Sequence, residues 1–345
     1  MDSVESSATS IECSSNFPSK IYACMSDGGR FIAFWQIGEN SIRFYDPSDF
    51  QEPNFIDTFD SFREMRDYYK NREDLAELDE IVLAAGHIFA QRLSILDTRN
   101  FILSKMPLGS YWPRIWRGRY SENDPLSTYN PVSARSIYRS NFVQSIVATS
   151  SLFSYLLEIF KHVEPATDNL NVFGHKIREL LILACTEVES AWRSVLEANS
   201  ASKKRSYNTA DYYRTKAPLR LDQWAVALKD YPNIGEFSPF LEWNKENSTK
   251  SLPWYDSYNA TKHNRETNFS RANLKDLIYA IAALHIMQAA QWGPELFDPF
   301  HGNVVSPFFL TKWPDYDAAH QYIPNADMNE KLRPRLYFED RHDAE

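Results

Sequence analysis

Cysteine and glycine are both scarce in this chain of 345 residues. The three cysteines are Cys13, Cys24 and Cys185, and only 10 residues are glycine. An odd, small cysteine count whose spacing fits no zinc motif indicates a reduced, cytoplasmic setting. Loops that cradle nucleotide phosphates depend on clustered glycines. Because the chain has neither a Walker loop nor a G-x-G-x-x-G motif, a nucleotide site of either kind is not expected.

Other motifs that carry chemistry are missing as well. The sequence has no H-E-x-x-H motif, no paired cysteine motif and no G-x-S-x-G nucleophile elbow. We therefore predict that the protein uses no metal and no cofactor.

Positive charge is in deficit. Lysine and arginine together number 37, against 46 aspartates and glutamates, and the formal net charge is −9. A protein that coats DNA or RNA normally presents a basic surface, so this balance argues against general nucleic-acid binding. It still permits a local basic groove.

One apolar run raises the question of a membrane span. Residues 142–160 form a stretch of 19 residues, which is near the minimum for crossing a bilayer. Because the stretch contains Gln144, Glu158 and several serines, we predict a buried helix of a soluble protein and no membrane contact. Residues 1–19 lack the basic start and the apolar stretch of a signal peptide, and we expect them to be disordered.

The composition, 43% hydrophobic and 14% aromatic, suits a globular protein with sizeable cores. Residues 20–46 contain three short aromatic and β-branched runs separated by turn sequences, which predict a small antiparallel meander. Two amphipathic helices are expected over 57–74 and 75–96. The fold is expected to be mainly α, with boundaries at 1–19 for the disordered start, 20–100 for the meander and helices, 101–140 for an irregular connection, 141–293 for a helical bundle and 294–345 for a proline-rich tail.

Within the bundle, residues 172–199 give the clearest helical pattern. Apolar residues recur at helical spacing at Ile177, Leu180, Leu181, Ala184, Val188, Ala191 and Val195. A second long helix is expected after Ser270, a suitable N-cap, and is expected to end at Gly293. The polar segment 200–252 between them predicts loops around short helices. The tail from 294 is expected to wrap the surface or hang loose.

Three basic segments allow more than one interpretation. Segments 111–120 and 203–220 mix basic and aromatic residues, which suits single-stranded nucleic acid but is more typical of solvated chain. His175 and Arg178 lie near the start of the 172–199 helix, where a cation is unfavourable for the helix dipole. We expect these two side chains to need an acidic partner or a ligand.

The richest stretch is PWYDSYNATKHNRETNFSR, residues 253–271. If 253–265 is helical, Asp256, Asn259 and His263 lie along one line of the helix surface. Tyr255, Tyr258, Lys262 and Arg265 form a second line beside it. Such a set could perform acid–base chemistry on a phosphodiester. It could equally be a hydrogen-bonded connection between helices, with the aromatic rings at the edge of the core.

Two segments carry a family resemblance. LNVFGHKIRELLILACTEVESAW is followed by LPWYDSYNATKHNRETNFSRANLKDLIYAIAAL, and the pair resembles a group of uncharacterised bacterial proteins and the wider HEPN class of helical bundles. The resemblance covers residues 170–292 and implies a helical bundle that forms a homodimer. Many HEPN proteins are metal-independent ribonucleases of toxin–antitoxin and phage-defence systems. Their motif consists of an arginine, then four to six other residues, then a histidine, whereas here Arg265 follows His263.

Three functions follow as hypotheses. The first is a non-catalytic binding or sensing protein of bacterial defence or stress response, with a partner protein from the same operon. The alternative is a metal-independent endoribonuclease acting on single-stranded RNA. In that case His263 is the acid and base, Lys262 and Arg265 hold phosphate, Asn259 and Asp256 orient the imidazole, and Arg178 completes the catalytic set. The substrate-binding residues are then Trp254, Tyr255, Tyr258 and Arg271. A third hypothesis is a small-ligand binder that uses this cluster as an anion pocket.

Overall fold

The structure is a computed structural model that divides into two compact units, residues Met1–Lys105 and Met106–Glu345. Each unit is described by itself. The described residues are 20–25, 31–37, 42–45, 54–55, 101–107, 109–117, 139–297, 304–322 and 333–339. The expected disordered start, 1–19, and the two helices expected over 57–74 and 75–96 lie outside these residues.

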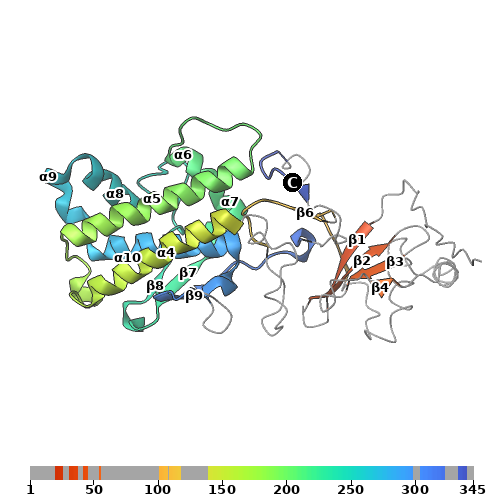
Figure 1. Cartoon of the computed structure of the whole chain (residues 1–345), viewed down its shortest axis with the longest axis horizontal. Helices are drawn as coiled ribbons and strands as arrows, with labels where there is room; N and C mark the ends of the chain where they lie inside the picture. Colours follow the sequence, from red (N-terminus) through yellow and green to blue (C-terminus); the bar gives the residue numbers. More distant parts are fainter. Residues whose placement is uncertain are drawn as a thin grey trace, which may run out of the picture. The chain divides into compact units, whose positions relative to one another are not determined.

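The first unit contains a sheet of five strands in the order β4-β3-β2-β1-β5 (Figure 1). All of its neighbouring strands are antiparallel, so the predicted meander is confirmed. Strand β5 comes from residues that were expected to be an irregular connection, and it pairs Leu103 with Tyr22 of β1. The strands are β1 (Lys20–Met25), β2 (Phe31–Ile37), β3 (Ile42–Tyr45), β4 (Asn54–Phe55) and β5 (Phe101–Leu103).

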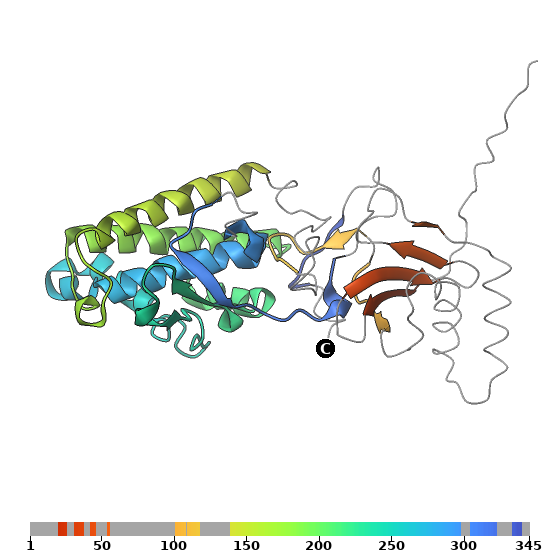
Figure 2. The same cartoon turned by 90° about the horizontal axis from the view of Figure 1, so that it is seen from below.

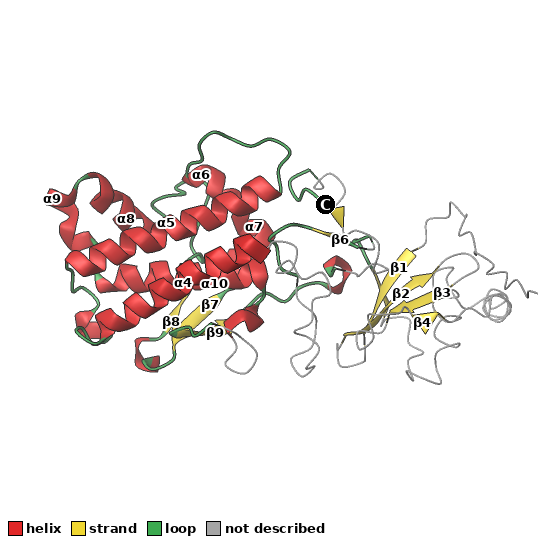
Figure 3. Ribbon diagram, viewed as in Figure 1, coloured by secondary structure: helices red, strands yellow, loops and turns green. Residues whose placement is uncertain are grey.

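The second unit is mainly helical, as expected (Figure 3). Helices α4, α5 and α10 run side by side, and α10 also packs against α8 (Figures 1 and 2). Because α10 is apolar almost all round, it is buried between its neighbours and forms the centre of the core. The helices are α4 (Arg139–Phe160), α5 (His175–Ala198), α6 (Thr209–Tyr212), α7 (Lys216–Leu219), α8 (Pro253–His263), α9 (Arg265–Asn268) and α10 (Leu274–Trp292).

The predictions for α5 and α10 agree with the structure to different degrees. Every member of the apolar stripe predicted for α5 is buried, so this prediction is confirmed. The N-cap of α10 is Asn273, whose side chain accepts a hydrogen bond from the backbone N–H of Asp276 at 2.9 Å. The prediction of Ser270 as the cap is therefore wrong, because Ser270 belongs to a 3-10 turn, Phe269–Arg271, that precedes the helix.

A second sheet lies on the opposite side of α10 from α5 (Figures 1 and 2). It consists of β7 (Ala225–Leu228), flanked by β8 (Glu236–Phe237) and β9 (Phe308–Lys312), all antiparallel. Strand β7 is entirely buried, and Phe308 of β9 has no exposed surface. The expectation of loops over 200–252 and of a loose tail is therefore wrong in part, since each segment supplies core strands.

Two further strands pair the tail with an earlier segment. Strand β10 (Arg333–Pro334) pairs in parallel with β6 (Ser110–Tyr111). Segment 111–117, predicted to be solvated, is largely buried, and the guanidinium group of Arg117 lies over the ring of Trp112 at 5.2 Å.

Helix α4 has one packed face and one open face. Leu152, Phe153, Leu156 and Phe160 are buried, whereas Val143, Val147 and Tyr155 are about half exposed or more. The prediction of a buried helix is therefore right for one face only. Among the described residues, Ser140–Phe160 is the one helix long and apolar enough to cross a membrane by length and composition, and 22% of its most apolar window is buried.

An aromatic cluster joins α5 to the polar segment 200–252. Trp192 of α5 stacks against Tyr212 and Trp243, each with a centroid distance of 5.1 Å. Phe240 and Trp254 complete the cluster with centroid distances to Trp192 of 6.1 and 6.3 Å. Because these rings are all buried, they fix the position of α8, which carries the predicted site, against α5.

Candidate functional site

The aromatic residues of the predicted site lie in the core. Helix α8 begins at Pro253, which occupies its first turn as expected. Trp254, Tyr255 and Tyr258 are at most 4% exposed. The indole N–H of Trp254 donates to the backbone oxygen of Pro239 at 3.1 Å. In this arrangement the rings stack on other protein rings, and no ring face is open for a nucleic-acid base.

The two tyrosine hydroxyls connect α8 to charged groups. Tyr255 donates to Glu189 Oε1 of α5 at 2.5 Å. Burial, followed by this carboxylate, raises the pKa of Tyr255 far above its ordinary value. Lys262 Nζ donates to the Tyr258 hydroxyl at 2.7 Å, and this hydrogen bond is the main cause of the raised pKa of Lys262. Burial also raises the pKa of Tyr258, so both tyrosines remain protonated in the folded protein.

Two further titratable groups are buried at the starts or along the lengths of the neighbouring helices α5 and α10, and they interact electrostatically with each other. Cys185 is fully buried one turn before Glu189 on α5, and burial raises the pKa of its thiol. Asp276 is 8% exposed at the start of α10, and burial raises the pKa of its carboxyl group. The thiol is a protonated core group rather than an accessible nucleophile.

The predicted line of Asp256, Asn259 and His263 does not act as one unit. Asp256 forms an ion pair with Arg271, with 2.6 Å between Oδ2 and Nη2. Asn259 is partly buried in the middle of α8, and His263 is exposed in the last turn. Among the described residues, His263 has no polar partner, so the carboxylate of Asp256 does not orient its imidazole ring.

The sequence predicts an acidic partner or a ligand for Arg178, but its partner in the structure is a backbone carbonyl group. Its Nη2 atom donates to the backbone oxygen of Thr261 at 3.0 Å, near the C-terminal end of α8. A cation is favourable there because it meets the negative end of the helix dipole. Helix α9 begins at Arg265, whose side chain lies outside the described residues. Arg178, Lys262 and His263 are thus brought to one end of the bundle.

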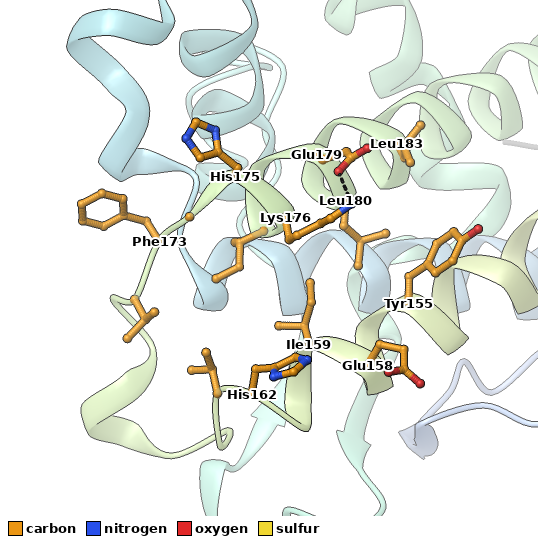
Figure 4. A pocket seen from close by; sticks show the side chains of 14 residues that line it. Tyr155, Glu158, Ile159, His162, Phe173, His175, Lys176, Glu179, Leu180 and Leu183 are labelled. Carbon is orange, nitrogen blue, oxygen red and sulfur yellow. Dashed lines mark hydrogen bonds and ion pairs between the residues drawn. The ribbon is translucent and has the colours of Figure 1, made fainter.

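One cavity lined by described residues lies elsewhere, between the end of α4 and the start of α5 (Figure 4). This α4–α5 groove has a volume of about 770 Å³. Most of its lining is apolar, and several of these side chains are partly exposed. The lining residues are Tyr155, Glu158, Ile159, His162, Val163, Val172, Phe173, Gly174, His175, Lys176, Ile177, Glu179, Leu180 and Leu183.

The charged side chains at the groove are arranged in pairs. Glu158 binds Lys161 at 2.6 Å, and Glu179 binds Lys176 at 3.0 Å. His175 packs its ring against Phe269 with a centroid distance of 4.8 Å. The described residues contain no group of three or more His, Cys, Asp or Glu that could hold a metal ion.

Sequence reasoning missed the groove, although two weak signals were present. Leu183 is apolar but lies off the buried stripe of α5, and it is 45% exposed. Val172 and Phe173 are apolar residues just before a helix start, and both are exposed. Each of these features is common on protein surfaces. Only the packing of α4 beside α5 shows that these residues line one cavity.

Comparison of the chain with protein-family models, with curated proteins and with solved structures finds no match. The resemblance to the HEPN class therefore remains a prediction from the two quoted segments.

Proposed function

We propose that this chain is a non-catalytic binding protein, a HEPN-like helical bundle that takes its ligand in the α4–α5 groove. The observation that carries this proposal is an open, largely apolar cavity of about 770 Å³ whose lining carboxylates are already paired with lysines. Cavities of this size and character are the usual sites for ligands. The apolar lining residues Phe173 and Leu183 are each nearly half exposed, and both line this one groove.

The contacts that α8 makes with the rest of the bundle support the same proposal. Tyr255, Asp256 and Arg178 are engaged with other parts of the bundle, where they connect helices. A general acid–base histidine normally has a second group that orients its ring. His263 has none among the described residues. The groups that would perform catalysis are thus mostly used to hold α8 in place.

The biological setting is proposed from the resemblance alone. It implies a cytoplasmic bacterial protein of defence or stress response that forms a homodimer and has a partner protein from the same operon. The ligand of the groove and the partner protein are separate questions, because the groove is large enough for a small molecule without any second chain.

The experiment uses an apolar dye, 8-anilinonaphthalene-1-sulfonate, with the full chain. We expect the double variant Phe173→Gln and Leu183→Gln to reduce dye fluorescence several-fold at unchanged helical circular dichroism, because both side chains are partly exposed. The matched control is Leu241→Gln, since Leu241 is 55% exposed and does not line the groove. Equal dye fluorescence in the wild type and the double variant would rule out the groove as the binding site.

The metal-independent ribonuclease is kept as a second candidate because of one observation. Lys262 and His263 are both exposed in the last turn of α8, beside the point where Arg178 is anchored. This function predicts cleavage of labelled single-stranded RNA in the presence of a chelator, and loss of that cleavage in His263→Ala. Intact RNA after incubation with the wild-type chain removes this candidate.

A further inference from the structure

Helix α4 lies at the outer edge of the bundle and turns one long face to solvent (Figure 2). At about 100° per residue, the exposed positions of this open face lie within about 60° of one line along the helix. These positions are Ser140, Val143, Gln144, Val147, Ser151, Ser154, Tyr155 and Glu158. The outer face of a surface helix normally carries charged residues, whereas no charged residue occurs from Ser140 to Leu157.

The serines in the middle of the open face have hydrogen-bond partners inside the helix. The hydroxyl group of Ser151 donates to the backbone oxygen of Val147 at 3.0 Å. That of Ser154 donates to the backbone oxygen of Ser150, also at 3.0 Å. Because these donors are satisfied within α4, another protein surface can cover them without leaving an unpaired donor. Their small side chains also allow a second helix to approach closely.

The centre of the open face is complementary to a copy of itself. Its residues recur at spacings of four and three, the repeat of a contact between two long helices. They are Ser140, Gln144, Val147, Ser151 and Ser154. If two copies of α4 run antiparallel and cross at the level of Thr149, Gln144 of one copy lies level with Ser154 of the other. Val147 then lies level with Ser151, so each of these layers joins a larger side chain to a smaller one.

A parallel pair would fit less well. Each residue would then meet its own copy, and the layers of Ser151 and Ser154 would join two small side chains and leave voids. Parallel helices also bring like ends of their dipoles together, whereas antiparallel helices bring opposite ends together. The order of side chains along the open face therefore favours the antiparallel pair.

The available surface is large enough for a reversible dimer. Tyr155 of α4 and the exposed Leu183 of α5 line the same groove, so the two helices form one continuous surface. Helix α4 has 22 residues and is roughly 33 Å long, and two helices side by side are roughly 20 Å wide. A contact of about 600 Å² per copy, or about 1,200 Å² in total, lies at the lower limit of specific interfaces. Such a dimer dissociates on dilution.

A membrane surface fits the open face less well than a second copy does. Helices that bind to membrane surfaces carry lysine and arginine beside an apolar face rich in large side chains. Neither lysine nor arginine occurs from Ser140 to Leu157, and serine and glutamine occupy much of the centre of the face. The net charge of −9 also opposes binding to anionic lipid.

We propose that two copies of this chain associate through the open face of α4, with the two helices antiparallel about the level of Thr149. The homodimer belongs to the proposed function, on which this inference rests, and the inference assigns its interface. Because Tyr155 and Leu183 also line the α4–α5 groove, the second copy borders the ligand site.

The test measures the mass of the full chain by sedimentation over roughly 1 to 100 μM, the range in which a weak dimer dissociates. We expect the wild type to change from monomer to dimer, and Val147→Lys to remain a monomer at unchanged helical circular dichroism. Val147 is 61% exposed and does not line the groove, so neither folding nor dye binding depends on it. The matched control is Val305→Lys, which should dimerise as the wild type does, since Val305 is exposed outside α4.

The other outcomes separate the interface from the rest of the proposed function. If Val147→Lys dimerises as the wild type does, the α4 interface is overturned and the homodimer stands. If the wild type is a monomer throughout, the interface and the homodimer both fail, while dye binding in the groove is unaffected. Wild-type monomers that bind to phosphatidylcholine vesicles, with loss of binding in Val147→Lys, would make the open face a membrane site and overturn the proposal.

A cross-linking experiment tests the orientation. Val147→Cys and Ser151→Cys are prepared separately, mixed and oxidised, with the wild type giving the background from the chain's own cysteines. We expect several times more disulfide-linked dimer in the mixture than in either variant alone, because only residues on the same level come within disulfide distance. If Val147→Cys alone forms as much linked dimer as the mixture, the antiparallel arrangement is wrong.

Discussion

The hydroxyl group of Tyr255 donates a hydrogen bond to Glu189 Oε1 at 2.5 Å and thereby joins α8 to α5. Both side chains come from segments that resemble the HEPN class, yet the contact is structural. Tyr255 is 4% exposed, and Glu189 is partly buried, so the carboxylate depends on this hydroxyl for one of its hydrogen bonds. Residues 253–271, the stretch richest in reactive side chains, therefore contribute to the stability of the bundle.

The first prediction concerns this contact. We expect Tyr255→Phe to lower the free energy of unfolding by about 1.5–3 kcal/mol, because a partly buried carboxylate loses a hydrogen bond. Urea unfolding measures the change. Glu189→Gln should reduce the effect of Tyr255→Phe, since the acceptor is then uncharged. A cost below about 0.5 kcal/mol would show that the hydrogen bond is not maintained in solution.

The second prediction concerns Arg178 at the end of α8. We expect Arg178→Met to cost about 1 kcal/mol and to speed amide exchange near the C-terminus of α8, because the carbonyl group of Thr261 loses a charged donor. Lys176→Met is a matched control on the same turn of α5. Its ion pair with Glu179 is well exposed, so its loss should change little. Similar effects of the two variants would show that Arg178 does not stabilise the C-terminal end of α8.

The third prediction concerns pH. His285 is fully buried; its Nδ1 lies 2.8 Å from Ser306 Oγ, and its ring stacks on Phe297. Burial, with a smaller contribution from Lys229, lowers the pKa of His285 to about 3. Between this value and the ordinary value near 6.5, the unfolded chain binds a proton that the folded chain does not. Stability should therefore fall as pH drops through this window, by about 1.4 kcal/mol per pH unit for this one group.

The variant His285→Phe isolates that contribution. Because phenylalanine does not titrate, the variant should lose less stability than the wild type when pH is lowered from about 6.5 toward 4. Chemical unfolding at a series of pH values gives both slopes. If the two slopes are equal, His285 takes up a proton in the folded protein, and the assignment of a neutral buried ring is wrong.

The fourth prediction tests the tail. Phe308 of β9 has no exposed surface, whereas its neighbour Phe309 is 44% exposed. We expect Phe308→Ala to lower the free energy of unfolding by about 3–5 kcal/mol through the lost contacts and the cavity. Phe309→Ala should cost less than about 1 kcal/mol. Equal small costs for both variants would mean that the tail is not part of the core.

Long periodic helices could be predicted from the sequence, and short strands could not. The stripe of α5 extends over several turns, and its buried members match the prediction. Strands β7 and β9 have four and five residues, and runs so short carry too little periodicity to distinguish strand from helix. The proline-rich composition of the tail also suggested loose chain, although Pro307 and Pro314 lie outside β9 and do not interrupt it.

The candidate site was predictable in its helix but not in its partners. The sequence identifies α8 and the two lines of residues on it. The partner of Tyr255 is Glu189 of α5, a residue that helical spacing within α8 does not identify. The Asn273 cap is a local contact with Asp276, three residues further along the chain. The α4–α5 groove depends on chain segments that meet only in the folded protein. The N–H of Leu274, for example, donates to the backbone oxygen of Val172.

The stacked pair of Trp192 and Trp243 has an optical consequence. Their rings are 5.1 Å apart with an interplanar angle of 29°, and both lie within residues Met106–Glu345. Because both rings are buried and held in one geometry, the pair should contribute to the near-ultraviolet circular dichroism of the native chain. That signal disappears when fixed side-chain packing is lost, even where helices persist. It therefore offers a spectroscopic reading of the bundle core that needs no label.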